Sequence, residues 1–408
     1  MKYIVLVADG MADYPIKELN DMTPLEAART PNMDFIARNG RMGRVKTIPE
    51  NMTPASDVAN MAILGYNPRE FYSGRGPLEA ANMGIELSPD DVAFRCNLVT
   101  VAGDTMVDYS SGHITSKEAG GLIKSISGKL GSEKFKFYPG ISYRHLMVAK
   151  DGALESLDKV DCTAPHDILG KSFSANLPKG KNSRELVDLI KRSREILETH
   201  EINTVRIDLK ENPANMIWLW GQGKKPSFPT FKEKYGLNGS VISAVDLIKG
   251  LGKLVGLEAL NIPGATGYYD TDYLGKAKAA IKSLERNDFV FVHVEAPDEA
   301  GHNGHLREKI TAIERFDQLV VGTILEAFKK KTNFRILVLP DHATPIALRT
   351  HTADTICFGL YGQDITGRGF LKYSEKEAGK SDLFFPEGYR LMDFFIKNYS
   401  EIPPKQEN

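Results

Sequence analysis

The sequence contains little cysteine and has almost no net charge. Its 408 residues include only three cysteines, Cys96, Cys162 and Cys357, which lie far apart and form no CxxC pair. This spacing argues against a disulfide scaffold and against a thiolate zinc site, and it favours a reducing cytoplasm. The formal net charge of -1 gives no indication of a nucleic-acid or membrane partner.

Long hydrophobic runs are also missing. No apolar stretch approaches the ~20 residues that cross a bilayer. The N-terminal sequence MKYIVLVADG holds an apolar run that is too short for a signal peptide. The composition, with 42% hydrophobic and 26% charged residues, is typical of globular enzymes, and the length suits two or three domains. We therefore expect a soluble cytoplasmic protein, and no feature indicates an oligomeric state.

The stretch from Phe289 to His305 combines a buried strand with many ligand-type side chains. Phe289 to Val292 is apolar, as in a buried strand, and six candidate ligands follow: His293, Glu295, Asp298, Glu299, His302 and His305. Asp298 and His302 are four residues apart, so a helical turn would place both on one face. That spacing offers two ligands to one divalent metal. The alternative is a solvated polar turn with scattered histidines.

Two further apolar strands end in ligand-type residues. Tyr3 to Ala8 is followed by Asp9, and Phe334 to Leu339 is followed by Asp341 and His342. His351 lies nine residues beyond His342. Open α/β sheets place active sites at the carboxyl ends of their strands. Three strands that each end in a ligand-type residue are seldom found by chance. The oxygen and imidazole ligands suit Mn²⁺, Zn²⁺ or Mg²⁺.

Ser56 lies where a short helix is expected to begin, because apolar residues recur from Val58 to Leu64. Helix N-terminal N–H groups and the helix dipole suit a serine nucleophile that must carry a phosphate. The alternative is that Ser56 or Thr53 only caps the helix. Six oxygen and nitrogen ligands divide into two divalent sites, and two metals activate a hydroxyl for in-line phosphoryl transfer.

The pattern of expected strands and helices changes between about residues 86 and 228. Strands are expected at 92–101 and 142–148, and helices at 117–130 and 183–200. We therefore predict an α/β core formed by 1–85 and 229–408, with an inserted α+β domain at 86–228. In the core, residues 239–256 are expected to form one helix. Candidate groups for acid/base chemistry and anion binding, each with an ordinary surface role as alternative, are Arg75, His113, Arg144, His145, His166 and Asp167.

These motifs resemble the alkaline phosphatase superfamily, and more closely the archaeal-type 2,3-bisphosphoglycerate-independent phosphoglycerate mutases. Longer strings carry the resemblance to this branch along nearly the whole chain, including GRGPLEAANMG, FRCN, PANMIWLWGQG and NGSVISAVDLIKG. The motifs of the superfamily are VADG with Asp9, TPASDVANMAILGY with Ser56, APDEAGH with Asp298 and His302, LPDHATP with Asp341 and His342, and RTHT with His351.

The resemblance implies an alkaline-phosphatase-like three-layer core and a smaller inserted lid domain that binds substrate. One metal would be held by Asp9, Ser56, Asp341 and His342, and the other by Asp298, His302 and His351. Ser56 would be the nucleophile, His113 resembles the acid/base histidine of the insert, and His305 falls outside the pattern. Looser matches suggest substrate binding by Arg75, Arg144, His145, Asp167 and Lys225.

The implied activity is the interconversion of 3-phosphoglycerate and 2-phosphoglycerate through a phosphoserine, in glycolysis or gluconeogenesis. It would need two divalent ions, Mn²⁺ or Mg²⁺ or else Zn²⁺, and no 2,3-bisphosphoglycerate. The substrate would be a small phosphorylated hydroxy acid. Two alternatives stay open: a phosphotransferase of the same family that acts on another hydroxy acid or on an amino acid such as homoserine, and a metal-dependent phosphomonoesterase. A non-catalytic binding protein would be expected to have lost part of the metal set.

Overall fold

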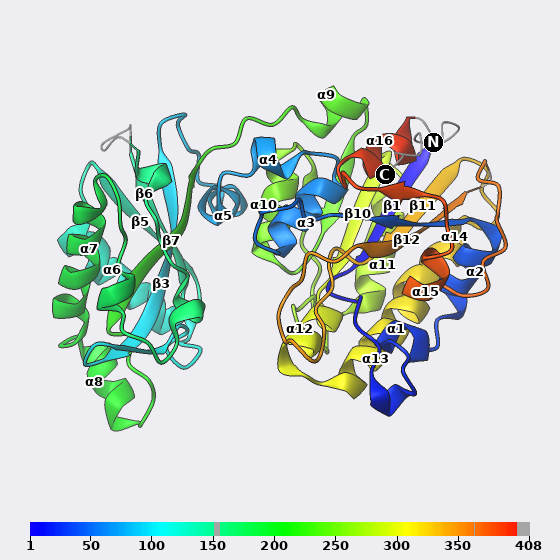
Figure 1. The fold of residues 1–408 in the computed structure, drawn as a ribbon. Helices are drawn as coiled ribbons and strands as arrows, with labels where there is room; N and C mark the ends of the chain where they lie inside the picture. The colour runs from blue at the N-terminus through cyan, green and yellow to red at the C-terminus, as the bar shows by residue number, and fades with distance from the viewer. Residues whose placement is uncertain (151–155, 363, 398–408) are drawn as a thin grey trace. The chain divides into compact units, whose positions relative to one another are not determined.

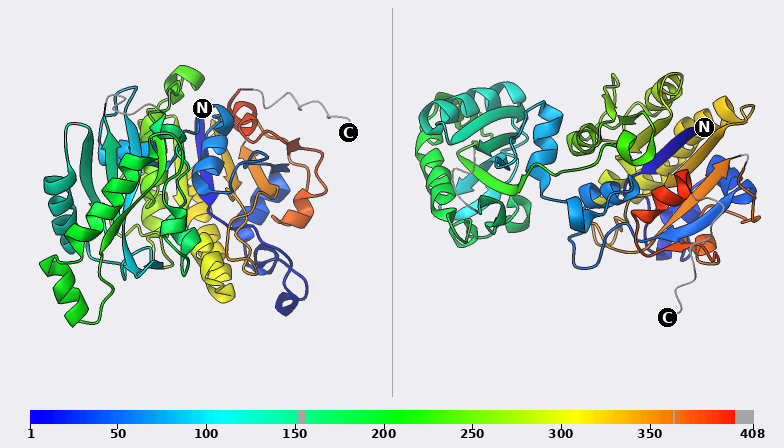
Figure 2. Two further views of the ribbon diagram at one scale, coloured as in Figure 1. Left: turned by 60° about the vertical axis from the view of Figure 1, so that its left-hand side comes forward. Right: turned by 90° about the horizontal axis from the view of Figure 1, so that it is seen from above.

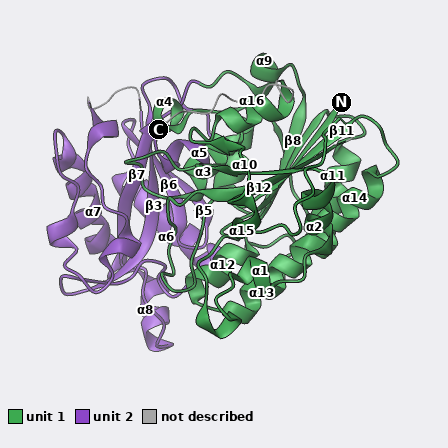
Figure 3. Cartoon of the chain, turned by 45° about the vertical axis from the view of Figure 1, so that its right-hand side comes forward, with its two compact units in different colours: residues 1–72, 228–408 green, residues 73–227 purple. Residues whose placement is uncertain are grey.

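The chain forms two compact units in a computed structural model (Figures 1 and 3). The structure describes residues 1–150, 156–362 and 364–397. Unit 1 comprises residues 1–72 and 228–408, and unit 2 comprises residues 73–227. The sequence-based boundary at 85/86 differs from the observed one at 72/73 because helix α5 (Arg75–Met83) packs on strands of unit 2.

Unit 1 is built on an eight-stranded sheet with the order β13-β2-β12-β11-β1-β10-β8-β9. Strand β1 lies between β10 and β11 and is parallel to both. Six of its seven residues are buried, as in parallel sheets that are covered on both faces. The strands are β1 (Lys2–Ala8), β2 (Arg41–Val45), β8 (Gly239–Ile242), β9 (Glu258–Leu260), β10 (Phe289–Val294), β11 (Phe334–Leu339), β12 (Ile356–Gly362) and β13 (Phe384–Phe385).

Helices cover both faces of this sheet (Figure 2). On one face, Ile4 and Leu6 join a core cluster with α1 (Pro24–Ala27), α2 (Pro31–Asn39), α11 (Tyr273–Ser283), α12 (Ala296–Asn303), α13 (Leu306–Arg315), the π-helical turn η5 (Phe316–Val321), α14 (Gly322–Phe328) and α15 (Glu375–Ala378). On the other, Tyr3 contacts Phe395 and Phe289 contacts Phe231. That layer contains α3 (Ser56–Ile63), α9 (Phe231–Tyr235), α10 (Asp246–Leu254) and α16 (Arg390–Ile396). The three-layer α/β core is confirmed.

Unit 2 is an α+β unit with a five-stranded antiparallel sheet. Strand β3 lies at its centre and pairs with β4, β6 and β7. Helices α6 and α7 share the larger core cluster, and α5 covers the opposite side through Ala80. The elements are β3 (Val92–Ala102), β4 (Thr105–Asp108), α6 (Ser116–Leu130), β5 (Phe135–Ile141), β6 (Arg144–Ala149), α7 (Ser183–Leu197), α8 (Glu201–Asp208) and β7 (Met216–Lys224).

The prediction of a single helix at 239–256 is wrong. Gly239–Ile242 is strand β8, which pairs with β10 through Phe289 and Gly239, and the helix begins only at Asp246. A side chain at position 239 would meet the carbonyl oxygen of Phe289 at 2.8 Å, so the glycine permits this pairing. The β-branched pair Val241-Ile242 belongs to the strand, and Ser243 follows it in a turn. Among the described helices, none combines the length and apolar character needed for a transmembrane segment.

Glu375 is a half-buried residue at the start of α15 whose carboxylate is turned toward the interior of unit 1. Its Oε2 accepts a hydrogen bond from Thr23 Oγ1 at 2.9 Å. Its Oε1 is buried and has no hydrogen-bond partner within the described ranges. Burial raises the pKa of Glu375 to about 7 from the ordinary 4.5.

This shift predicts a pH-dependent stability. The folded state holds the Glu375 proton more tightly than the unfolded state, so the free energy of unfolding falls as pH rises from 4.5 to about 7. The loss is up to roughly 3 kcal/mol. In Glu375→Gln this component should vanish, measured by urea unfolding in EDTA across that pH range. The exposed control Glu18→Gln should keep the slope; an unchanged slope in Glu375→Gln would contradict the assignment.

Candidate metal and phosphoryl-transfer site

The carboxyl ends of three neighbouring parallel strands bring the predicted ligands together. Val7 of β1 lies opposite His293 of β10 on one side and Leu339 of β11 on the other. The residues that follow these strands therefore emerge at one edge of the sheet, where α/β proteins build their sites. Asp9 follows β1, Asp341 follows β11, and α12 with Asp298 follows β10.

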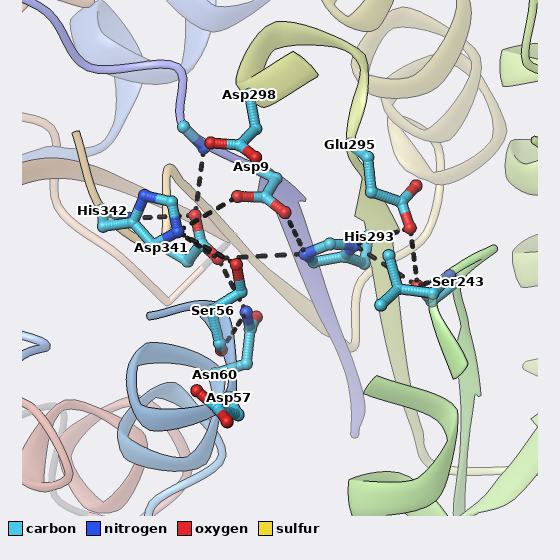
Figure 4. A network of polar contacts seen from close by, with 12 residues as sticks. Asp9, Ser56, Asp57, Asn60, Ser243, His293, Glu295, Asp298, Asp341 and His342 are labelled. Carbon is cyan, nitrogen blue, oxygen red and sulfur yellow. Dashed lines mark hydrogen bonds and ion pairs between the residues drawn. The ribbon is translucent and has the colours of Figure 1, made fainter. Parts of the chain in front are cut away.

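Ser56 is the first residue of α3, and its hydroxyl is not used as a helix cap. The N-cap is Ala55, which provides no capping side chain. Instead, Ser56 Oγ lies 3.1 Å from His342 Nε2 (Figure 4). Asn60, one turn further on, donates to the Ser56 carbonyl at 2.8 Å and to Asp341 Oδ2 at 2.7 Å, and so ties the start of α3 to the strand end. The geometry favours a functional hydroxyl over the capping alternative.

Asp9 and Asp341 form a buried carboxylate pair around His342. His342 Nε2 lies 3.4 Å from Asp9 Oδ1 and 3.6 Å from Asp341 Oδ2. Burial and the nearby charges of Asp341 and Asp298 raise the pKa of Asp9 well above its usual range. Burial would also raise the pKa of Asp341, but His342 and His293 hold it below its usual range. Burial lowers the pKa of His342 itself.

Asp298, His302 and His351 form a second cluster. Helix α12 places Asp298 and His302 one turn apart, as expected, with His302 Nε2 3.2 Å from Asp298 Oδ2. His351 Nε2 lies 3.4 Å from Asp298 Oδ1 and 2.8 Å from His302 Nε2. Burial alone would lower the pKa of His302, but the Asp298 carboxylate raises it to about 9. His302 and His351 in turn hold the pKa of Asp298 well below its usual range, against the effect of burial.

The second cluster has the tautomer of a metal site. His302 Nδ1 lies 3.0 Å from the carbonyl oxygen of Arg349, to which it donates. When a metal displaces the second proton, the Nε2 lone pair of the ring faces Asp298 and His351. Two imidazole nitrogens 2.8 Å apart need a proton or a cation between them. Glycine at position 10 makes room here, because a Cβ on Gly10 (φ +60°) would lie 2.5 Å from Asp298 Oδ1.

His342 connects the two clusters. Its ring centroid lies 4.1 Å from that of His351, and its Nε2 faces Ser56 and Asp9. All seven predicted residues are therefore brought together. Two groups have ligand atoms within 4.8 Å of one another: Asp298 with His342 and His351, and Asp9 with His293 and Asp341. The expected partition, with His342 beside Asp9 and His302 beside Asp298, also agrees with the contacts and stays a prediction.

The donor set fits divalent cations. It offers carboxylates, imidazoles and a hydroxyl and includes no thiolate, which suits Mn²⁺, Mg²⁺ or Zn²⁺. In the part of the chain that the structure describes, buried Asp9 Oδ1 has no hydrogen-bond partner. An unpaired carboxylate oxygen in the interior is costly, and a cation would compensate it.

Sequence reasoning missed several residues that hold this site in place. Thr344 donates to Asp298 Oδ1. Lys309 of α13 is fully buried, and its Nζ lies 2.7 Å from Asp13 Oδ2 and 2.8 Å from the Thr344 carbonyl oxygen. Of the supporting residues, only Asn60 could have been found from the sequence, because it follows Ser56 by one helical turn and so lies on the same helix face. Lys309 could not have been found in this way, because a lysine in an amphipathic helix is expected at the surface.

Unit 2 contains a separate basic and aromatic cluster. Arg75 and Arg95 both lie over the Trp220 ring, with guanidinium carbons 5.5 and 4.5 Å from its centroid. Arg95 was not predicted; it is buried on β3, and its Nε lies 3.0 Å from Glu79 Oε1. Burial and the positive charges of Arg75 and Arg144 lower the pKa of Arg95, although Glu79 opposes them. Three guanidinium groups, of which that of Arg95 is paired with Glu79, could together attract an anion, and this role stays a prediction.

Aromatic contacts link most other candidates of unit 2 to this cluster. The His166 ring packs on Trp220 and on Tyr109, and His166 Nε2 lies 3.7 Å from exposed Asp167. Tyr143 contacts Tyr109, exposed His113 and the guanidinium of Arg144.

His145 and Lys225 have different surroundings. His145 is buried, its Nδ1 accepts a hydrogen bond from Gly140 N at 2.9 Å, and burial lowers its pKa to about 3. A neutral, tethered imidazole of this kind suits packing better than charge recognition. Lys225 is exposed on the segment after β7. The substrate-binding roles of both residues remain predictions.

Comparison with known proteins gives one consistent family. A model of the 2,3-bisphosphoglycerate-independent phosphoglycerate mutases matches residues 37–203. The protein of that name from Methanosarcina acetivorans is 53% identical and covers 93% of this chain and 96% of its own. A probable 2,3-bisphosphoglycerate-independent phosphoglycerate mutase from Geobacter sulfurreducens is 48% identical, with coverage of 97% and 100%.

Solved structures agree with this family. A protein structure from Pyrococcus horikoshii has a TM-score of 0.83 at 30% identity and covers 100% of this chain and 99% of its own. The cofactor-independent phosphoglycerate mutase from Thermoplasma acidophilum has a TM-score of 0.66 at 25% identity, with coverage of 97% and 99%. Identity near one half extends over almost the entire length of the curated relatives. The chain therefore belongs to the 2,3-bisphosphoglycerate-independent phosphoglycerate mutases, which are isomerases.

Proposed function

We propose that this chain interconverts 3-phosphoglycerate and 2-phosphoglycerate through a phosphoserine on Ser56, at a site with two divalent cations. The observation that carries the proposal is the position of the Ser56 hydroxyl. It lies at a helix start, 3.1 Å from His342, where the Asp9–Asp341 and Asp298–His302–His351 clusters meet. Cations bound there would lower the pKa of the hydroxyl and offset charge on the phosphoryl group.

The reaction is two phosphoryl transfers in sequence. Ser56 Oγ attacks phosphorus, the Oγ–P bond forms as the bond from phosphorus to O3 of glycerate breaks, and the proton lost by Ser56 balances the one that O3 gains. In the second transfer, O2 of glycerate loses a proton to a base and attacks the phosphoserine, and Ser56 recovers its proton. The N–H groups at the start of α3 suit the anionic phosphoserine, and Asn60 holds that turn against Asp341.

Unit 2 would supply the recognition of glycerate. Arg75, Arg95 and Arg144 would bind its carboxylate, since guanidinium groups match that geometry. His113, exposed beside Tyr143, would exchange the proton of the accepting hydroxyl. Unit 2 would also exclude water, because a hydrated phosphoserine would hydrolyse and the enzyme would act as a phosphatase.

Phosphorus NMR tests the proposal. Purified protein is given 3-phosphoglycerate and Mn²⁺ without 2,3-bisphosphoglycerate, and the signal of 2-phosphoglycerate should appear. Free phosphate alone would indicate a phosphomonoesterase. If no reaction occurs until another donor and an acceptor such as homoserine are supplied, the mutase assignment fails in favour of a transferase.

A further inference from the structure

His293 is buried beside the carboxylates of the site and lies outside the seven residues that were predicted to bind metal. It lies near the end of β10 and is fully buried. Its Nε2 lies 3.2 Å from Asp9 Oδ2 and 3.9 Å from Asp341 Oδ2 (Figure 4). Across the described residues, this nitrogen has no hydrogen-bond partner. Nε2 instead forms an ion pair with Asp9 when it is protonated, because the pKa of His293, which burial alone would lower, is raised by the two carboxylates well above its usual range. A divalent cation at the same place would take over the role of that proton.

The other side of the ring is fixed by a serine and a glutamate. His293 Nδ1 lies 3.3 Å from Ser243 Oγ and 3.7 Å from Glu295 Oε1. Ser243 Oγ in turn donates to Glu295 Oε1 at 3.2 Å. With the carboxylate and the hydroxyl on this side, the ring keeps its proton on Nδ1 when a cation replaces the proton on Nε2. The Nε2 lone pair then points toward Asp9 and Asp341.

A buried lysine completes this support. Lys276 of α11 is fully buried, and its Nζ lies 3.3 Å from Glu295 Oε2 and donates to the His293 carbonyl oxygen at 2.9 Å. Burying an ion pair costs desolvation energy, and it yields a fixed geometry. The Lys276 charge and these contacts hold the pKa of Glu295 at about 2, although burial alone would raise it. Glu295 is therefore a fixed anion behind the His293 ring.

We propose that His293 is an additional metal ligand: its Nε2 completes, with Asp9 and Asp341, a site for a divalent cation. Ser243, Glu295 and Lys276 are positioning residues that set the tautomer and the direction of the ring. Carboxylate–histidine–metal chains of this kind orient ligands in many metal sites. An imidazole in the set favours Mn²⁺ or Zn²⁺ over Mg²⁺, which prefers oxygen ligands. The inference rests on the proposed two-cation site and adds a ligand to it.

Binding of Mn²⁺ by titration calorimetry, with the EPR signal of free Mn²⁺ as a second readout, tests the assignment. His293→Gln should weaken one of two binding events by about 100-fold, and Glu295→Gln should weaken the same event by about 10–100-fold. The control His305→Gln alters an exposed histidine and should leave both events unchanged. Circular dichroism checks that each variant is folded. Unchanged Mn²⁺ affinity in folded His293→Gln overturns the inference.

A measurement on the unmodified protein avoids any failure of the variants to fold. In crystals grown with Mn²⁺, the anomalous signal should place a cation within bonding distance of His293 Nε2. A cation bound by Asp9 and Asp341 but remote from Nε2 overturns the inference and leaves the proposed function intact. If the protein takes up no Mn²⁺ at all, both fail.

Discussion

Ser56→Ala should reduce mutase activity by about 10⁴-fold or more, because the variant has no atom that can carry the phosphoryl group. The backbone of α3 should be unaffected, since alanine is the best helix former and the Ser56 hydroxyl does not cap the helix. Rates from phosphorus NMR with 3-phosphoglycerate measure the loss. The same assay should detect no phosphoserine in the variant.

The control for this substitution is Thr53→Ala. Thr53 is exposed, lies three residues before Ser56, and was the other possible cap of the helix. It should keep nearly full activity. Ser56→Ala should still bind Mn²⁺ at the Asp298–His302–His351 cluster, because none of these side chains contacts the hydroxyl directly. Activity above roughly 1% of the unmodified protein would refute the nucleophile assignment.

The sequence was sufficient to predict the residues that obey a local rule. A short apolar strand that ends in Asp9 or Asp341 predicts a site at the carboxyl edge of a parallel sheet, and β1, β10 and β11 lie side by side as this rule requires. The spacing of Asp298 and His302 predicts one helical face, and α12 provides it.

The support behind His293 could not be predicted, because its residues come from separate elements. Ser243 follows β8, Lys276 lies on α11, and Glu295 follows β10. Ser243 in particular was placed inside an expected helix at 239–256. Only the pairing of β8 with β10 brings Ser243 to the His293 ring. Side-chain contacts across strands depend on sheet order, which local hydrophobic patterns do not encode.

The basic and aromatic cluster of unit 2 shows the same limit. Arg95 is one charged residue in the apolar strand β3, and its role depends on Trp220 of β7. Strand β3 pairs with β7, and Arg95 lies directly opposite Trp220. Neither β5 nor β7 was expected from the sequence. Without β7 there was no reason to give Arg95 a role, and its ion pair with Glu79 was seen only in the structure.

Asp298→Asn should remove one of the two proposed cations and lower activity by about 10³-fold. The substitution keeps the shape of the side chain but replaces the negative charge that His302 and His351 face. A metal site that loses an anionic ligand loses most of its affinity. Calorimetric titration with Mn²⁺ should show one binding event of near-normal strength and one weakened by at least about 100-fold.

In metal-free protein, the same substitution should also change how the free energy of unfolding depends on pH. Asp298 raises the pKa of His302 to about 9, from the ordinary 6.5. The stabilisation from this pair is fully present below pH 6.5 and is lost as pH rises through about 9, because the folded state holds the proton more tightly. In EDTA, the free energy of unfolding of the unmodified protein should therefore fall across this window, and in Asp298→Asn the fall should be largely absent.

NMR titration of the His302 ring measures this effect directly. The pKa of His302 should drop from about 9 toward its ordinary 6.5 in Asp298→Asn, since burial then acts without the opposing carboxylate. Asp270→Asn makes the same chemical change at an exposed position and should alter neither the titration nor Mn²⁺ binding. A His302 pKa that stays near 9 in Asp298→Asn would mean that another group holds the proton. In that case the pairing of Asp298 with His302 would not be the basis of this metal site.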